Sequence, residues 1–131
     1  MAMTPEQQEF LTGHQWAVLA TGRKDGSPQV SMIAYVWDGE QLLATFRRGS
    51  AKRYNMLRQP RVALVVPDDR RALTVYGEAE LLEEGPDRVA AYAAILAGFG
   101  ISPAPDGLES QMDDEGRVAV RIRPEQLELH D

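Results

Sequence analysis

Short stretches of alternating apolar and polar residues run through most of the chain, and this period of two is typical of β-strands. They predict six strands, over residues 16–21, 29–37, 41–46, 61–66 and 72–82 and a last one around 118–122. Asp25-Gly26 and Asp38-Gly39 favour tight turns, so the first three strands are predicted to form an antiparallel meander. Six short strands with few helices indicate a small closed barrel, a mainly β fold of the α+β class that forms a single domain over residues 1–131.

Three stretches outside these strands have the signals of short helices. Thr4 is the predicted N-cap of the first helix, with Pro5 at its first position and Phe10 and Leu11 on its buried side. The second helix covers residues 51–58 and ends before a proline. The third covers residues 86–96, with a predicted apolar stripe of Val89, Ala90, Tyr92, Ala93 and Leu96. Glycines and prolines, Pro103 and Pro105 among them, predict a loop over residues 98–117 that includes the acidic residues 113–115.

Alternation also assigns residues to the two faces of a strand. In the 29–37 strand we place one set toward the core, consisting of Val30, Met32, Ala34 and Val36. The opposite face carries Gln29, Ser31, Ile33, Tyr35 and Trp37. Because Ile33, Tyr35 and Trp37 then point away from the core, a second copy of the chain is expected to cover them, which predicts a homodimer. In the 72–82 strand the predicted inward residues are Leu73, Val75, Ala79 and Leu81, and Gly77 predicts a bulge or a close backbone approach.

Composition excludes some classes of protein. The chain has no cysteine, so it has no disulfide, thiol nucleophile or thiolate metal site. Neither a signal-peptide pattern nor an apolar run of about 20 residues is present, so we expect a cytoplasmic protein with no membrane segment. The net charge is −6, which disfavours nucleic acid as a partner.

Positive charge is concentrated in one segment of this acidic chain. Residues 41–67 hold six basic residues and no acidic one, whereas the other 104 residues hold 8 basic and 20 acidic ones. If Ser50 is the N-cap of the second helix, Lys52 and Arg53 lie in its first turn, where cations oppose the helix dipole at about 0.3–1 kcal/mol each. One interpretation is a solvated surface, and a nucleic-acid contact is a minor alternative. The other is an anion site in which free backbone N–H groups, the Ser50 hydroxyl and the Lys52 ammonium bind phosphate oxygens.

No other group of residues has the spacing of a catalytic or metal site. His14 and His130 stand alone, and Glu78 and Glu80, on one strand face, are interpreted as surface glutamates. Neither G-x-S-x-G nor the glycine-rich phosphate loop G-x-x-x-x-G-K is present. If the protein is an enzyme, a bound cofactor therefore supplies the chemistry.

Several segments, taken in order, resemble one known group of proteins. They are Ala-Val-Leu-Ala-Thr at 17–21, Asp-Gly-Ser-Pro-Gln-Val-Ser at 25–31, Thr45, Ser-Ala-Lys-Arg-Tyr-Asn at 50–55, Gln-Pro-Arg-Val-Ala-Leu at 59–64 and Gly-Glu-Ala at 77–79. This order is similar to that of the pyridoxamine 5'-phosphate oxidase-like flavin and deazaflavin superfamily, with the greatest likeness to the branch that uses coenzyme F420 (the B group). The resemblance covers residues 10 to about 85.

The resemblance implies a six-stranded split β-barrel and a homodimer with cofactor sites at its interface. It implies that Ser50 and Lys52 hold the cofactor phosphate with Thr45 and Asn55 nearby. The strand that carries Gln29, Ser31, Ile33 and Tyr35 would run beside the cofactor ring.

One departure bears on which cofactor is used. True pyridoxamine phosphate oxidases carry an Arg and a Lys on the second strand that bind the FMN phosphate, and here the corresponding residues are Ser31 and Val36. Their absence favours the deazaflavin. Arg47, Arg48 and Arg53 would meet its acidic glutamate tail, with at least one of Arg47 and Arg48 in direct contact.

The resulting hypothesis is an F420-dependent oxidoreductase that transfers a hydride from the reduced cofactor to a small conjugated organic substrate. The alternatives are an FMN-dependent oxidase or reductase on the same barrel and a non-enzymatic binder of a flavin-like ligand.

Overall fold

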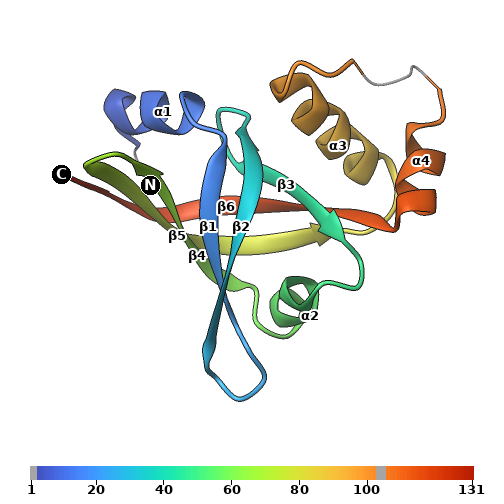
Figure 1. Cartoon of the computed structure of the whole chain (residues 1–131), viewed down its shortest axis with the longest axis horizontal. Helices are drawn as coiled ribbons and strands as arrows, with labels where there is room; N and C mark the ends of the chain where they lie inside the picture. Colours follow the sequence, from blue (N-terminus) through green and yellow to red (C-terminus); the bar gives the residue numbers. More distant parts are fainter. Residues whose placement is uncertain (1–2, 103–105) are drawn as a thin grey trace.

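The strands form a closed antiparallel barrel in the order β1-β2-β3-β6-β5-β4 (Figure 1). The computed structural model describes residues 3–102 and 106–131. The strands are β1 (Trp16–Gly22), β2 (Pro28–Trp37), β3 (Leu42–Arg47), β4 (Arg61–Asp68), β5 (Arg71–Leu82) and β6 (Arg117–His130). The six predicted strands and the barrel are confirmed, although β6 is much longer than its short apolar core suggests.

Four helices of the described residues lie outside the barrel. They are α1 (Pro5–Thr12), α2 (Ala51–Arg58), α3 (Pro86–Gly98) and α4 (Leu108–Glu115). Thr4 caps α1 as predicted, because its hydroxyl accepts a hydrogen bond from the Gln7 backbone N–H. No helix in these ranges is long and apolar enough to cross a membrane.

The predicted loop over 98–117 is wrong for its second half, where α4 forms. Leu108 and Met112, one helical turn apart, are buried against Tyr92 of α3. Gly116 follows α4 in a left-handed conformation (φ 65°), which is the usual helix stop. Pro103 and Pro105, part of the same prediction, lie outside the described residues.

The predicted faces of β2 are reversed in the structure. Ile33 and Tyr35 are buried in the barrel core, whereas Val30 and Met32 are 65% and 62% exposed. The Tyr35 hydroxyl donates a 2.8 Å hydrogen bond to the Leu11 carbonyl of α1. The strand pattern separates the two faces correctly, but α1 and the closure of the barrel decide which face is inside.

The predicted apolar stripe of α3 is confirmed in part: Tyr92 and the partly buried Val89, Ala93 and Leu96 pack with residues of α4, and a second stripe with Ala91 and Ile95 faces the barrel. The buried residues of α3 are Arg88, Ala91, Tyr92 and Ile95, and Ala90 is exposed. The helix needs two apolar stripes because it packs on β3 and β6 on one side and on α4 on the other. Arg88 was missed because an arginine does not count as apolar in a hydrophobic pattern.

The barrel is open between β2 and β3 over part of their length. These strands pair only through Tyr35–Trp37 and Leu42–Ala44, whereas Pro28–Ala34 of β2 pairs with β1 alone. The backbone N–H and C=O groups on the free edge of β2 therefore have no strand partner on this side. This opening, together with the start of α2 at the end of β3, is the part of the fold that carries the predicted site residues.

Candidate functional site

The N-terminus of α2 has a serine at its cap that does not cap. Ser50 has the extended backbone of an N-cap residue, but its side chain makes no capping hydrogen bond. Its Oγ atom is buried and has no hydrogen-bond partner among the described residues. A buried hydroxyl without a partner costs about 1–3 kcal/mol. Thr4, at the same position of α1, does cap its helix, so the missing bond at Ser50 leaves a donor and acceptor available for a ligand.

Lys52 is the cation of α2 that remains free for an anion. In the described part of the chain its ammonium forms no ion pair, and it lies 5.5 Å from the centroid of the Phe46 ring. The first turn of α2 contains no acidic residue. The backbone N–H groups of this turn, the Ser50 hydroxyl and the Lys52 ammonium therefore form a group of donors without an internal acceptor.

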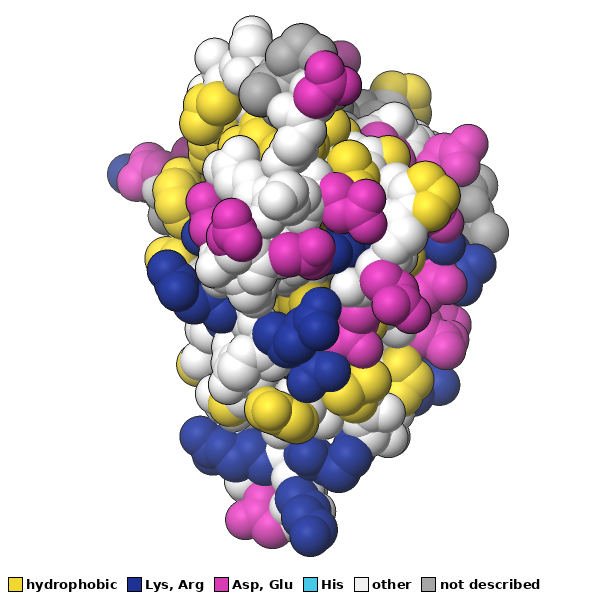
Figure 2. Space-filling model, turned by 90° about the vertical axis from the view of Figure 1, so that its right-hand side faces the viewer, with side chains coloured by type: hydrophobic (Ala, Val, Ile, Leu, Met, Phe, Trp, Pro, Cys, Tyr) yellow, Lys and Arg dark blue, Asp and Glu magenta, His cyan; other side chains and the backbone are white. Residues whose placement is uncertain are grey.

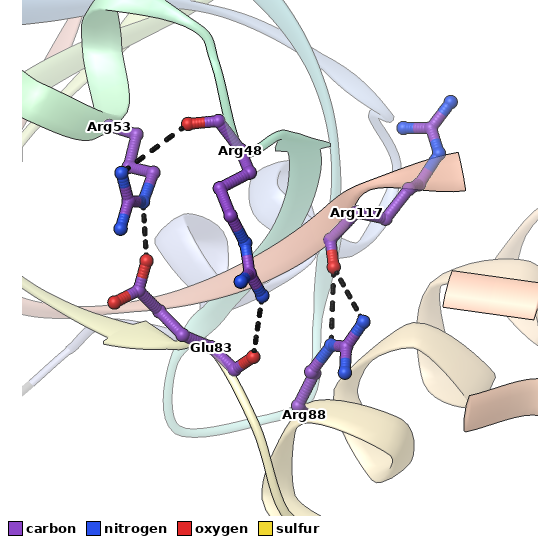
Figure 3. Close-up of polar contacts among 5 residues, drawn as sticks. All are labelled: Arg48, Arg53, Glu83, Arg88 and Arg117. Carbon is purple, nitrogen blue, oxygen red and sulfur yellow. Dashed lines mark hydrogen bonds and ion pairs between the residues drawn. The ribbon is translucent and has the colours of Figure 1, made fainter. Parts of the chain in front are cut away.

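Arg53 and Arg48 are less free than the sequence suggested, because the loop after β5 brings Glu83 to them (Figure 3). The Arg53 guanidinium pairs with the Glu83 carboxylate, and this hydrogen bond raises the pKa of Arg53. The Arg48 guanidinium donates to the Glu83 carbonyl oxygen at 3.1 Å. The basic segment has no acidic residue of its own, but the fold supplies one from outside it. Arg47 forms no ion pair or side-chain hydrogen bond within the described ranges.

Asn55 joins α2 to the barrel. Its side-chain amide nitrogen donates to the Thr21 hydroxyl at 3.0 Å and to the Gln29 side-chain oxygen at 2.9 Å. Its own oxygen accepts a 2.8 Å bond from Arg58, and the residue is only 5% exposed. Asn55 is thus a positioning residue, which holds α2 against β1 and the free end of β2.

The remaining predicted residues fall into two groups. Thr45 is half-buried on β3 and donates to the Val118 carbonyl at 2.9 Å, and Ser31 is half-buried on the segment of β2 with the free edge. Ile33 and Tyr35 share the Ser31 face but lie deep in the core, where burial raises the pKa of the Tyr35 hydroxyl. The opening therefore includes Gln29, Ser31 and Thr45, whereas the side chains of Ile33 and Tyr35 face the barrel interior.

A cavity of about 460 Å³ opens beside Ser50. Its lining consists of Arg47, Arg48, Gly49, Ser50, Glu115 and Gly116. The last two come from the end of α4, and the Arg48 backbone N–H donates to the Gly116 carbonyl at 2.7 Å. Glu115 accepts hydrogen bonds from Gln111 and Arg117, which lower its pKa. Sequence reasoning missed this wall because α4 was predicted as loop, although Leu108, Met112 and Gly116 have the spacing of a short capped helix.

Arg88 fixes α4 in this position. It is 2% exposed and donates twice to the Arg117 carbonyl (Figure 3). It also pairs with Asp113 of α4 at 2.8 Å. A buried guanidinium with all of these partners connects α3, α4 and β6. The cavity wall beside Ser50 therefore has a rigid support.

Comparison with known proteins identifies the family. The sequence model of the pyridoxamine 5'-phosphate oxidase family matches residues 3–131. The chain belongs to this family. Its closed barrel with an opening between β2 and β3 agrees with the split-barrel fold of the wider flavin and deazaflavin superfamily. No curated protein matches the chain in sequence.

Solved structures of other proteins have the same fold over most of the length of this chain. A conserved hypothetical protein, Rv2991 from Mycobacterium tuberculosis, superposes with a TM-score of 0.83 at 24% identity, over 100% of this chain and 86% of that one. A structure named F420 reductase is 29% identical, with a TM-score of 0.71 over 95% of this chain and 98% of that one. A putative pyridoxamine 5'-phosphate oxidase from Listeria innocua is 21% identical, with a TM-score of 0.70 over 92% of both chains.

Proposed function

We propose that the protein is a coenzyme F420-dependent oxidoreductase that reduces a small conjugated organic substrate. One observation carries the proposal: at the N-terminus of α2 the buried Ser50 hydroxyl has no partner, and Lys52, two residues further along the same turn, forms no ion pair among the described residues. A phosphate group satisfies both, since it accepts hydrogen bonds from hydroxyl, ammonium and backbone N–H donors. The site residues thus fit a phosphate-bearing cofactor.

The residues around the phosphate have separate roles. Ser50 and Lys52 hold the phosphate, and Asn55 fixes the direction of α2 through Thr21 and Gln29. The free edge of β2 between Pro28 and Ala34 offers backbone donors and acceptors to the ring system. The bound deazaflavin supplies a hydride when reduced. The protein contributes binding and orientation. In this proposal the proton comes from solvent, because the carboxylate that the described residues place at the cavity, Glu115, is already bound by Gln111 and Arg117.

Two observations favour the deazaflavin over FMN. Neither Ser31 nor Val36 supplies the second-strand cation that an FMN phosphate meets in true pyridoxamine phosphate oxidases. Among the structures compared, the F420 reductase has the higher sequence identity, 29% against 21% for the putative oxidase from Listeria. FMN remains the competing cofactor in the experiment below.

A second copy of the chain completes the site in this proposal. The outward face of β1 and β2 presents the large apolar side chains of Trp16, Val30 and Met32, each more than half exposed. Such a face on a soluble protein is typical of a protein–protein contact. It lies on the strand whose free edge borders the cofactor site, so a homodimer formed here places both sites at its interface.

The test is a titration of the purified protein with F420 and, separately, with FMN. We expect tighter binding of F420, and we expect Lys52→Ala to weaken it about tenfold to a hundredfold, because a charge-assisted contact contributes about 1.5–3 kcal/mol. Ser50→Ala should also weaken binding while leaving the free energy of unfolding unchanged or higher, since it removes an unsatisfied buried group. Arg70→Ala is the control, an exposed cation on the β4–β5 turn.

The outcomes separate the candidate functions. If the Lys52 variant and the wild-type protein bind F420 with equal affinity, α2 is not part of the cofactor site. Tighter binding of FMN would favour the FMN-dependent alternative. Binding of F420 with no oxidation of the reduced cofactor by conjugated ketones or nitro compounds would leave the protein as a cofactor binder.

A further inference from the structure

The cavity at Ser50 has a negative charge in its wall beside the positive ones. Glu115, the last residue of α4, lines this cavity of about 460 Å³ together with Ser50 and Arg47. A carboxylate beside a phosphate site opposes each negative charge that the ligand brings to it. We propose that Glu115 makes this site prefer a phosphodiester, which has one negative charge, to a phosphate monoester, which has two. The inference rests on the proposed cofactor site at the N-terminus of α2.

Neighbouring side chains hold the Glu115 carboxylate in place and keep it charged. One of its oxygens accepts a 3.1 Å hydrogen bond from the Gln111 amide, and the other accepts a 3.2 Å bond from the Arg117 guanidinium. These bonds lower the pKa of Glu115, so the group is a carboxylate at neutral pH. Arg117 offsets part of this charge, and both side chains are partly exposed. A ligand in the cavity is therefore repelled by a partly screened carboxylate.

The end of α4 adds a second negative feature to the same wall. The C-terminus of a helix carries partial negative charge on its free carbonyl groups, and α4 ends at Glu115 and Gly116 in the cavity lining. The Gly116 carbonyl accepts a 2.7 Å hydrogen bond from the backbone N–H of Arg48, two residues before Ser50. This bond ties the end of α4 to the segment that leads into α2. The start of α2 thus attracts an anion, and the wall that α4 supplies repels one.

The positive charge that is free near Ser50 also suits one negative charge better than two. Lys52 is half-buried and forms no ion pair in the described ranges. Arg53 is paired with Glu83, and the Arg48 guanidinium is bound to the carbonyl oxygen of that residue. Arg47 is exposed, so water and salt screen its charge. One ammonium group is therefore the main cation for the phosphate.

The two candidate cofactors differ in this property. The phosphate of FMN is a terminal monoester, and such a group carries a charge of about −1.5 to −2 at pH 7. The phosphate of F420 is a diester that joins the ring-bearing chain to the acidic tail, so it carries one charge. Its second ester branch can face Glu115 and the end of α4 without adding phosphate charge there. Repulsion by Glu115 would therefore contribute to the preference for the deazaflavin.

The test compares two ligands without a tail, the 5'-phosphate of the F420 ring and ribityl chain and the methyl ester of that phosphate. They differ by one negative charge, and fluorescence titration gives the dissociation constant of each. The wild-type protein should bind the methyl ester more tightly. Glu115→Gln should tighten the 5'-phosphate about two- to fivefold, as expected for one partly exposed charge, and the methyl ester by less. Because neither ligand has a tail, contacts of Arg47 with tail carboxylates do not enter the comparison.

Glu109→Gln is the matched control, because it removes the same charge from the exposed first turn of α4, outside the cavity lining. It should leave the ratio of the two affinities unchanged. Glu115→Asp, which retains the charge, should keep most of the preference. Glu115→Gln retains a side-chain oxygen for Arg117, and its free energy of unfolding checks that α4 stays in place.

Two kinds of failure can be told apart. If Glu115→Gln changes both affinities equally, or if the wild-type protein prefers the 5'-phosphate, the role of Glu115 is refuted while the cofactor site stands. If neither ligand binds more tightly than the same molecule without phosphate, the phosphate site itself is refuted, and the role of Glu115 with it.

Discussion

At the scale of single residues, contacts in the fold divide the basic segment into three groups. Arg53 and Arg48 are bound by Glu83, and Arg58 donates to the Gly22 carbonyl and the Asn55 side chain. Arg47, Lys52 and Arg61 have no such partner in the described part of the molecule. Only Arg53 is paired with a carboxylate, while neutral oxygens hold the Arg48 and Arg58 guanidinium groups in place. The side chains of the last group are therefore the ones of the six that are free to turn to a ligand.

This division leads to a prediction for Arg47. If the acidic tail of F420 extends from the cavity at Ser50, Arg47→Ala should lower affinity modestly, by about two- to fivefold, because exposed ion pairs contribute about 0–1 kcal/mol each. The loss should grow with the number of glutamates in the tail. Arg48→Ala is the comparison, since its guanidinium is already bound to a carbonyl. Titrations with cofactors of different tail length measure this, and a loss independent of tail length would argue against a tail contact.

At the scale of elements, the bulge between β5 and β6 at Gly77, where Glu125 of β6 is the extra residue, connects a sequence signal to a close backbone contact. Gly77 was predicted to mark a bulge or a close approach, and the structure shows both. A Cβ atom at this position would lie 2.4 Å from the Arg123 carbonyl oxygen of β6. Because the obstacle is backbone in a paired strand, a side-chain rotation cannot relieve it.

We therefore predict that Gly77→Ala lowers the free energy of unfolding by about 1–3 kcal/mol or more, the usual cost of overpacking a core. Gly49→Ala should change it little, because no atom lies within 4 Å of a Cβ built there. Urea unfolding monitored by tryptophan fluorescence gives both values. A Gly77 variant as stable as the Gly49 variant would show that β5 and β6 can separate at this point.

At the scale of the whole molecule, charge and apolar surface are unevenly distributed. Figure 2 shows acidic side chains over the upper part of one face, toward α3 and α4, and basic ones over its middle and lower part. The exposed apolar residues of β1 and β2 lie on strands that end at the basic hairpin. A second copy covering the apolar face would remove it from water, which is the main driving force for stable association.

The corresponding prediction is a dimer at micromolar concentration. Replacing Val30 and Met32 together with lysine should give a folded monomer, because both side chains point out of the barrel and two charges would have to be buried in the interface. Ile101→Lys, at another exposed apolar position, should leave the dimer intact. Sedimentation velocity distinguishes the two species. A wild-type protein that sediments as a monomer would refute the interface.

Most of the local structure could be predicted from the sequence. The limits of α2 follow from Ser50 and Pro60, and the strands follow from their alternation, because these signals act between residues close in the chain. The signal for an anion near Ser50 was also local, since it required only a helix start, two cations and no acid within the segment.

Only the tertiary structure decided which face of β2 is buried, which arginines are neutralised and what forms the wall beside Ser50. Ile33 and Tyr35 are inside because α1 closes the barrel over them, and Val30 and Met32 are left on the surface as a result. Glu83 reaches Arg53 across 30 residues of chain, and Arg88 holds α4 in place through Arg117 and Asp113. Alternation along a strand defines two faces but does not determine which face is inside. Ion pairs between residues far apart in the chain leave no periodic pattern in the sequence. The buried face of β2 and the partners of the arginines were therefore decided by the packed fold.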